Sequence, residues 1–348
     1  MAKVNVGIIG SGIGRYHIMG YQKCSDVVVS ALADINEEKG RKLATEFNIH
    51  NFYTDYKEIL KSKDITAVSV CTPNFLHASI TIDALNAGKH VLCEKPIAMN
   101  TAEAEKMLAA ANKNKKILMV GFTHRFRNES QMLKKLIENG ELGKIYHADA
   151  FAIRRRGIPG MGGWFTTKSM SGGGPIIDIG VHILDLSFWL MNWPKPVSVS
   201  AATYTKFGNK KGYIQANGWA GSFKSGVYDV EDYASAFIRM KDATLVMETS
   251  WASNIAEDKF YTVLLGDKAG ANLDYRGLKM FSEINGVLTD IFPKFTENPV
   301  YEDEMVHFID CVKNNKKPVS TGEQALIIQK VIDAIYRSAK ERKEIKIS

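Results

Sequence analysis

Short apolar runs alternate with longer amphipathic stretches through the first third of the chain. The apolar runs are residues 4–9, 27–33, 67–71, 89–93 and 117–122. Stretches with helical periodicity lie between them, over residues 36–47, 56–62, 76–87 and 101–114, and a further helix starts near Arg15. Alternation of this kind predicts a parallel sheet joined by right-handed crossovers. We therefore expect an N-terminal α/β domain over residues 1–122.

The pattern changes after residue 122. A helix (128–139) and a strand (144–154) lead into a glycine-rich stretch (157–174) and a largely apolar helix (175–191). Strand-like runs with period-two alternation then follow one another, over residues 197–201, 233–240, 243–251 and 259–265. Two helices, 302–314 and 323–341, end the chain. This order predicts a second, α+β domain over residues 123–348, with a large, mostly antiparallel open sheet.

A glycine-rich turn connects the first predicted strand to the first predicted helix. It reads Gly10-Ser11-Gly12-Ile13-Gly14, one residue shorter than the usual G-x-G-x-x-G spacing, in which Arg15 would be the third small residue. Backbone N–H groups and a helix start in this context favour a bound phosphate. The context thus predicts a dinucleotide site, although a purely structural turn is the alternative.

Asp34 ends the second predicted strand, 24 positions after Gly10. A carboxylate at about this distance accepts hydrogen bonds from the ribose hydroxyls of NAD and repels the extra phosphate of NADP. No arginine follows it directly, since Ile35 and Asn36 come next. The sequence therefore favours NAD over NADP. Asp34 could also be the N-cap of the helix over residues 36–47, and the two roles are compatible.

Lys95 follows the strand that ends at Cys93 and Glu94. Pro96 comes next, and a proline disfavours helical geometry in the residue before it. In parallel sheets of this type, ligands bind at the carboxyl ends of the strands. Because Lys95 and Glu94 lie at such an end, as do Gly10, Asp34 and Thr72, we expect the lysine amine on the cofactor side of the sheet.

The apolar helix over residues 175–191 carries Asp178, His182 and Asp185. Asp178 and His182 are four positions apart and so share a helix face. A carboxylate beside a histidine can orient the imidazole and raise its basicity, which suits proton transfer. The alternatives are a structural hydrogen bond and a metal pair, for which no third ligand with suitable spacing is visible. Gly172, Gly173 and Gly174 precede the helix, and we interpret them as allowing close approach to a ligand.

Composition and charge restrict the remaining function classes. The formal net charge is +7, but lysines are interleaved with acidic residues, which indicates a solvated basic surface and not a nucleic-acid site. The four cysteines show no C-x-x-C spacing, and so favour reduced thiols over disulfides or zinc. No leader precedes the first strand, and no apolar run approaches membrane-span length. We expect a cytoplasmic protein that takes a small molecule as its partner, without metal, nucleic acid or membrane.

Several motifs together resemble the Gfo/Idh/MocA oxidoreductases, the glucose–fructose oxidoreductase and inositol dehydrogenase family. They occur in the family's order over nearly the whole chain. They are the glycine turn followed by His17, Thr72-Pro73-Asn74 with His77, Glu94-Lys95-Pro96, Gly121-Phe122 with Arg125-Phe126, Gly172–Gly174 with Asp178, Gly180 and His182, and the C-terminal Ala334-Ile335-Tyr336-Arg337-Ser338. The short glycine turn is a variant within that family.

The resemblance implies an N-terminal Rossmann domain and an NAD(P)-dependent dehydrogenase that acts on CH–OH groups of sugars, cyclic polyols or their derivatives. It implies catalytic roles for Lys95, Asp178 and His182. The cofactor-binding residues would be Gly10, Gly12, Ile13, Gly14, Asp34, Thr72, Pro73, Asn74, His77, Glu94, Lys95 and Arg125. The family's large sheet often forms the subunit interface, so a homodimer or homotetramer is expected.

Substrate recognition is less specified. Besides Lys95, Asp178 and His182, the candidates are Arg154, which could bind an acidic or hydroxyl-rich substrate, and Trp164, which could stack on a sugar ring. Surface charge and core packing are their alternatives. Two other functions exist within the resembled family, a non-catalytic NAD- and sugar-binding regulator and an NAD-dependent glycosidase. The presence of Lys95, Asp178 and His182 together favours a dehydrogenase.

Overall fold

The computed structural model describes residues 3–208, 210, 213 and 226–347. Its backbone divides into two compact units. The first contains residues 1–126 and 298–327, and the second contains 127–297 and 328–348. The sequence pattern predicted one boundary near residue 122, whereas the observed units are interleaved along the chain.

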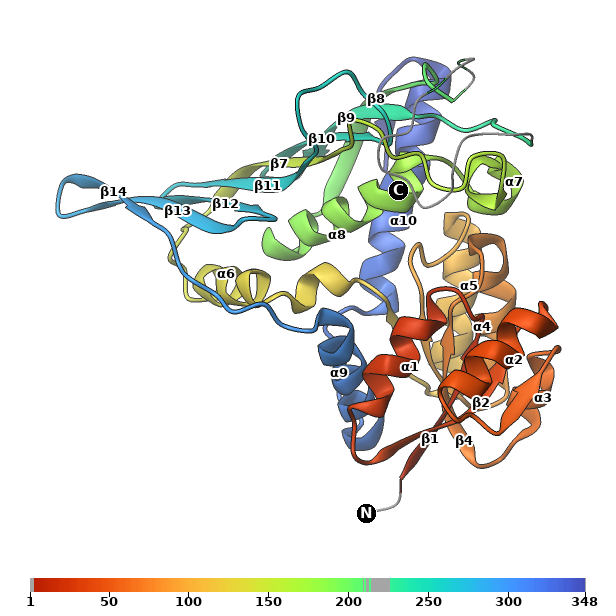
Figure 1. The fold of residues 1–348 in the computed structure, drawn as a ribbon. Helices are drawn as coiled ribbons and strands as arrows, with labels where there is room; N and C mark the ends of the chain where they lie inside the picture. Colours follow the sequence, from red (N-terminus) through yellow and green to blue (C-terminus); the bar gives the residue numbers. More distant parts are fainter. Residues whose placement is uncertain (1–2, 209, 211–212, 214–225, 348) are drawn as a thin grey trace. The chain divides into compact units, whose positions relative to one another are not determined.

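The first unit is built on a six-stranded parallel sheet in the order β3-β2-β1-β4-β5-β6. Figure 1 labels its strands β1, β2 and β4. This confirms the predicted Rossmann arrangement. The short edge strand β3 was not predicted, because three residues are too few for a clear period. The strands are β1 (Val4–Ile9), β2 (Val27–Ala33), β3 (Asn51–Tyr53), β4 (Ile65–Val70), β5 (His90–Cys93) and β6 (Leu118–Val120).

Helices connect these strands as the alternation predicted. They are α1 (Gly14–Gln22), α2 (Glu37–Glu46), α3 (Lys57–Lys61), α4 (His77–Asn86) and α5 (Thr101–Asn114), with short 3-10 turns η1 (Asn74–Leu76) and η2 (Thr123–Phe126). Apolar side chains from β1, β2 and β4 form a continuous core under them.

Helix α9 (Val300–Asn314) returns to the first unit from the far end of the sequence. Its Met305 and Phe308 are fully buried and belong to the same core as Ile18 and Tyr21 of α1. Helix α10 (Gly322–Glu341) begins in this unit and continues in the second. Local periodicity predicted both helices but carried no information on which core each one joins.

The second unit contains a nine-stranded sheet in the order β14-β13-β12-β11-β7-β10-β9-β8-β15. Among the described strands, only β7 and β10 pair in parallel, which confirms the predicted large, mostly antiparallel sheet. Its strands are β7 (Ile145–Ile153), β8 (Pro196–Tyr204), β9 (Tyr233–Met240), β10 (Thr244–Ser250), β11 (Lys259–Gly266), β12 (Ala269–Asp274), β13 (Gly277–Ile284), β14 (Val287–Ile291) and β15 (Ile345–Lys346).

One face of this sheet packs on helices, and its side chains alternate with those of the opposite face. Ala148, Ala150 and Ala152 of β7 are buried, whereas the residues between them are half-buried. The helical elements of the unit are α6 (Asn128–Glu138), η3 (Trp164–Thr166), α7 (Lys168–Ser171), the π-helix η4 (Ile176–Gly180) and α8 (Val181–Leu190), besides the later part of α10.

The stretch from Lys168 to Leu190 corrects the expectation that no apolar run approaches the length of a membrane span. It is long and apolar enough to cross a membrane by length and composition, with a mean hydropathy of 1.2 over its most apolar window. However, 89% of that window is buried inside the protein. Burial on all sides is typical of a core helix. Its apolar character therefore reflects packing on the nine-stranded sheet.

Candidate active site

The three glycines of the short turn have three different structural roles. Gly10 has φ +103°, and a Cβ there would lie 2.5 Å from the Cys71 carbonyl oxygen. A Cβ on Gly14 would lie 2.9 Å from Ile8 Cγ2, so this glycine allows close packing of α1 on β1. A Cβ on Gly12 would meet nothing within 4 Å. The turn thus provides a tight bend, an open backbone approach and helix–strand contact, which are the three requirements of a dinucleotide turn.

The Asp34 carboxylate lies directly against this turn. Its Oδ2 accepts a hydrogen bond from the Ser11 N–H at 2.7 Å, and its Oδ1 accepts one from the Asn36 N–H at 2.7 Å. The N-cap of α2 is Asn36, whose side chain accepts from the Lys39 N–H at 2.9 Å. Asp34 is therefore not the helix cap, and its position at the end of β2 suits a ribose.

Thr72 and His77 lie at the end of β4. The Thr72 hydroxyl is buried and has no hydrogen-bond partner among the described residues, as expected of a group that a ligand would satisfy. His77 is fully buried, with Nε2 2.8 Å from the Thr72 carbonyl oxygen and Nδ1 2.7 Å from that of Pro96. Burial lowers the pKa of His77, although both carbonyl contacts oppose the shift. His77 thus links the segments that follow β4 and β5, and Pro73 and Asn74 lie on the first of these.

Glu94 and His17 form a buried pair beside Lys95. His17 is fully buried on α1, and its Nε2 lies 3.0 Å from Glu94 Oε1. Burial pushes the pKa of Glu94 upward, but the hydrogen bond to His17 and the nearby Lys95 charge outweigh it and leave the pKa below its usual value. Glu94 Oε2 accepts from the Lys95 N–H at 3.1 Å. The pair fixes the backbone that carries the lysine.

Arg125 is fully buried in the first unit. Its guanidinium donates to the Val319 carbonyl oxygen at 2.5 Å and to Gln324 Oε1 at 2.7 Å. These contacts tie η2 to the start of α10. The side chain that was expected at the cofactor is therefore engaged by a segment about 200 residues later in the chain, as the separations of 194 and 199 positions show.

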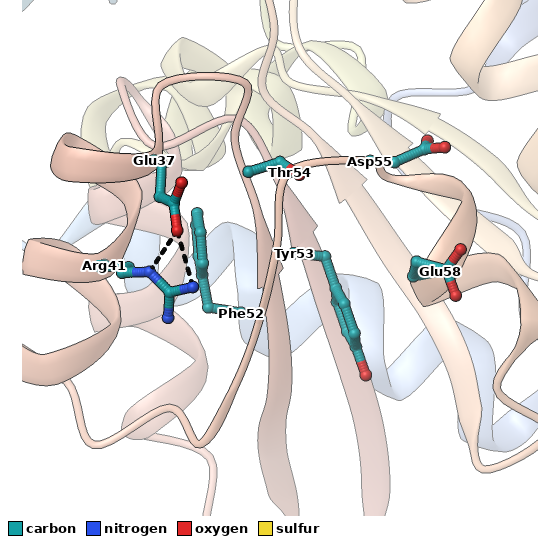
Figure 2. A pocket seen from close by; sticks show the side chains of 7 residues that line it. All are labelled: Glu37, Arg41, Phe52, Tyr53, Thr54, Asp55 and Glu58. Carbon is teal, nitrogen blue, oxygen red and sulfur yellow. Dashed lines mark hydrogen bonds and ion pairs between the residues drawn. The ribbon is translucent and has the colours of Figure 1, made fainter.

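A hollow of about 370 Å³ lies at the carboxyl end of β3 (Figure 2). It is lined by Glu37 and Arg41 of α2, Phe52 and Tyr53 of β3, Thr54, Asp55, and Glu58 of α3. Figure 2 shows Arg41 turned back to Glu37, which it contacts at 2.8 Å, with its guanidinium over the Phe52 ring. The arginine of α2 that lines the hollow is thus paired with a glutamate of its own helix.

Asp178 and His182 stand out on the helix of the second unit. From Gly173 to Leu190, they are the two residues that are not buried. Asp178 lies on the π-helix η4 and His182 in the first turn of α8, while Asp185 is buried. The helix predicted over residues 175–191 therefore begins as a π-helix over residues 176–180 and continues as an α-helix over residues 181–190. A π-turn inside a longer helix often occurs at a functional site.

Trp251 holds the Asp178 carboxylate. Its Nε1–H donates to Asp178 Oδ2 at 2.9 Å, and its ring is fully buried. Trp251 directly follows β10, and the Arg154 N–H, directly after β7, donates to the Ser250 carbonyl oxygen at 2.8 Å. Because β7 and β10 are parallel, both carboxyl ends meet beside the helix start that carries Asp178.

The two expected substrate residues differ in their placement. Arg154 lies at this strand end, and its guanidinium donates to the Gly157 carbonyl oxygen at 3.2 Å. Trp164 stacks on Phe165 with ring centroids 3.8 Å apart, in a loop bridged to Val227. No group of three or more potential metal ligands occurs within the described part of the chain.

The fold and these residues define a nicotinamide-dinucleotide-dependent oxidoreductase. The model for an oxidoreductase family with an NAD-binding Rossmann fold matches residues 4–122, and the GFO/IDH/MocA C-terminal domain matches 130–271. The chain belongs to the Gfo/Idh/MocA family. The open approach at Gly12, the Asp34 carboxylate and the buried Thr72 hydroxyl fit an NAD cofactor.

Several proteins that are similar to this chain are named as dehydrogenases. The chain is 35% identical over 341 residues to the D-glucoside 3-dehydrogenase of Escherichia coli, covering 97% of this chain and 95% of that protein. It is 26% identical to the myo-inositol 2-dehydrogenase of Thermotoga maritima, covering 99% and 98%. The solved levoglucosan dehydrogenase in complex with NADH and levoglucosan has the same fold, with a TM-score of 0.86 at 22% identity and 99% coverage of each chain.

Sequence reasoning gave no role to His17 and Trp251. His17 follows the glycine turn, so its position on α1 was visible, but its pairing with Glu94 spans 77 positions. Trp251 ends a predicted strand, and nothing local signals that its indole meets Asp178, 73 positions earlier.

Proposed function

We propose that the chain interconverts a secondary hydroxyl and a ketone on a sugar, cyclic polyol or derivative, with NAD as the hydride acceptor. Lys95, Asp178 and His182 are the catalytic residues of this proposal. The observation that carries it is the pair Asp178 and His182, the only side chains not buried in an otherwise buried stretch from Gly173 to Leu190. The named relatives, which act on a glucoside and on myo-inositol, support the substrate class.

Each residue has one task in the reaction. Bound NAD would accept the hydride from the carbon, and the hydroxyl proton would pass to a base, so that ketone, NADH and a proton are formed. Lys95, fixed beside the Glu94–His17 pair, would hydrogen-bond the reacting oxygen. His182 would take up the proton, and Asp178, anchored by Trp251, would hold a substrate hydroxyl near the histidine.

In this proposal, residues of the first unit bind the cofactor. Gly12, Ile13 and the start of α1 would receive the pyrophosphate, and Asp34 the adenosine ribose. Thr72, Pro73, Asn74 and Glu94 would line the same edge of the sheet. His77 and Arg125 serve by holding the surrounding segments, because their nitrogens already contact the chain's own oxygens.

Replacing Lys95 tests the reaction. Lys95→Ala should abolish NADH formation while the dissociation constant for NAD changes little, because the substitution removes the contact with the reacting oxygen. Lys63→Ala, at an exposed lysine of the same unit, is the matched control. Turnover is followed by NADH absorbance over a panel of glucosides, inositols, anhydro-sugars and sugar acids, with NADP in parallel. Unchanged turnover in Lys95→Ala would remove the lysine from the mechanism.

We further propose a homodimer or homotetramer formed through the nine-stranded sheet. The face opposite the helices carries Phe151 stacked on Tyr261 at 5.0 Å, and the exposed Tyr204, which pairs with Tyr233. Tyr261→Arg should lower the molar mass measured by light scattering, and an unchanged mass would contradict this interface.

The free cysteines of the described chain support a reducing, cytoplasmic location, which cell fractionation tests.

A further inference from the structure

The glycines before η4 pack against the protein's own side chains. A Cβ on Gly173 would lie 1.8 Å from the Tyr336 hydroxyl oxygen, and a Cβ on Gly174 would lie 2.0 Å from the Glu231 carbonyl oxygen. No side chain larger than hydrogen fits at either place. The sequence led us to interpret these glycines as a ligand approach, but at Gly173 and Gly174 the space is filled by Glu231 and Tyr336.

One carboxylate oxygen of Glu231 accepts three hydrogen bonds. Its Oε1 accepts from the Gly174 N–H at 3.0 Å, the Ile176 N–H at 3.3 Å and the Tyr336 hydroxyl at 2.8 Å. Glu231 is 8% exposed and lies just before β9, while Tyr336 lies on α10. Neither residue has a part in the chemistry described above.

The charges around this carboxylate are consistent with a fixed anchor. Burial raises the pKa of Tyr336 well above its usual value, so the phenol keeps its proton and donates. Burial also raises the pKa of Glu231, while the hydrogen bonds from Tyr336, Gly174 and Ile176 oppose the shift. The Lys168 ammonium lies 5.7 Å from the Tyr336 ring centroid.

The anchored backbone leads directly to Asp178. The Asp178 N–H donates to the Gly174 carbonyl oxygen at 3.2 Å, so Gly174 is bonded to Glu231 through its N–H and to Asp178 through its carbonyl. A displacement of Gly174 would therefore move Asp178, and His182 one turn further on. Small displacements of catalytic groups are costly, since about 1 Å can reduce the rate about 100-fold.

We propose that Glu231 and Tyr336 are positioning residues, which fix the start of the π-helix and thereby orient Asp178 and His182. This inference rests on the proposed function, because it assigns the pair a role in the same site. The tyrosine is contributed by α10, so the last helix of the chain takes part in orienting the catalytic helix.

Tyr336→Phe tests this positioning role, because it removes one hydrogen bond and keeps the ring. We expect kcat to fall about 10- to 100-fold, with little change in the dissociation constant for NAD. A second readout needs neither cofactor nor substrate. Hydrogen exchange of the Gly174 and Ile176 amides, followed by mass spectrometry on the free protein, should accelerate in this variant.

Substitutions of Glu231 and of Ser338 test the positioning role further. Glu231→Gln keeps an acceptor oxygen at the same place and should lower kcat less than Glu231→Ala. Ser338→Ala removes another buried hydroxyl of α10, which donates to the Lys343 carbonyl oxygen and accepts from the Ala201 N–H, and should leave kcat unchanged.

The outcomes separate this inference from the proposed function. If the unmodified protein turns over no member of the panel, the proposed function fails. If it turns over a substrate but Tyr336→Phe keeps its kcat, or loses kcat without faster amide exchange, the positioning role is overturned. Loss of kcat equal to that of Ser338→Ala would also overturn it, because the effect would then follow from general loosening of α10.

Discussion

The indole of Trp251 donates a hydrogen bond to the Asp178 carboxylate at 2.9 Å. The tryptophan follows strand β10 and is fully buried, whereas Asp178 is half-buried. A charged acceptor held by a buried neutral donor keeps one orientation, because a hydrogen bond to a charged group contributes about 1.5–3 kcal/mol. We infer that Trp251 orients the Asp178 carboxylate of the proposed active site.

Trp251→Phe removes this donor and keeps an aromatic ring. We expect kcat to fall about 10-fold, since Asp178 can rotate away from its position. Trp189→Phe is the matched control, because this buried indole of the same unit packs near the Lys134 ammonium, 5.5 Å from its ring. Steady-state NADH formation measures both variants. Equal kcat losses in the two would contradict the orienting role.

Gly10 and Gly12 should respond oppositely to alanine. Gly12→Ala should fold normally, because its Cβ would meet nothing within 4 Å, but should bind NAD more weakly, because the methyl group occupies the phosphate approach. Gly10→Ala should be unstable, since the Cβ would lie 2.5 Å from the Cys71 carbonyl oxygen and φ is +103°. Thermal unfolding and calorimetric titration with NAD distinguish them. Normal NAD affinity in Gly12→Ala would contradict the prediction that the phosphates of NAD approach the backbone at Gly12.

Asp34 should control the choice of cofactor. Replacing Asp34 by Ser together with Ile35→Arg removes the repelling carboxylate and adds a cation at a residue that is 93% exposed. We expect kcat/KM to shift from NAD towards NADP by about 100-fold or more, in line with the value of about 1.5–3 kcal/mol typical of hydrogen bonds to charged groups on each cofactor. Ile35→Arg alone is the control. No shift in the double variant would show that another residue selects the cofactor.

His90 should make stability depend on pH. Burial, with a smaller contribution from Lys116, lowers its pKa from 6.5 to about 4. The unfolded chain binds a proton in this window that the folded chain does not, so stability is present above pH 6.5 and is lost as the pH falls towards 4. His90 Nδ1 accepts from the Ile117 N–H at 3.2 Å, and asparagine offers an oxygen in its place. His90→Asn should therefore lose less stability than the unmodified protein between about pH 7 and pH 5, as measured by urea unfolding. If the unmodified protein and His90→Asn lose stability equally as the pH falls, His90 is not the cause of the pH dependence.

Local pattern determined much of this protein. The strand–helix alternation, the glycine turn and Asp34 predicted the first sheet and its cofactor edge, because periodicity and turn chemistry act between near neighbours in the chain. Glu94-Lys95-Pro96 at a strand end and Asp178 with His182 on one helix were likewise readable. These features need only the order of residues within one element.

Tertiary packing decided which distant groups meet. Trp251 reaches Asp178 across 73 positions, and Tyr336 reaches Glu231 across 105. The return of α9 to the first core and the π-turn at Asp178 also depend on neighbours from other elements. A hydrogen bond between such residues depends on how whole helices and strands pack, which no short stretch of sequence encodes. The sequence therefore determined the chemical groups of the site, and the packing decided how firmly each is held.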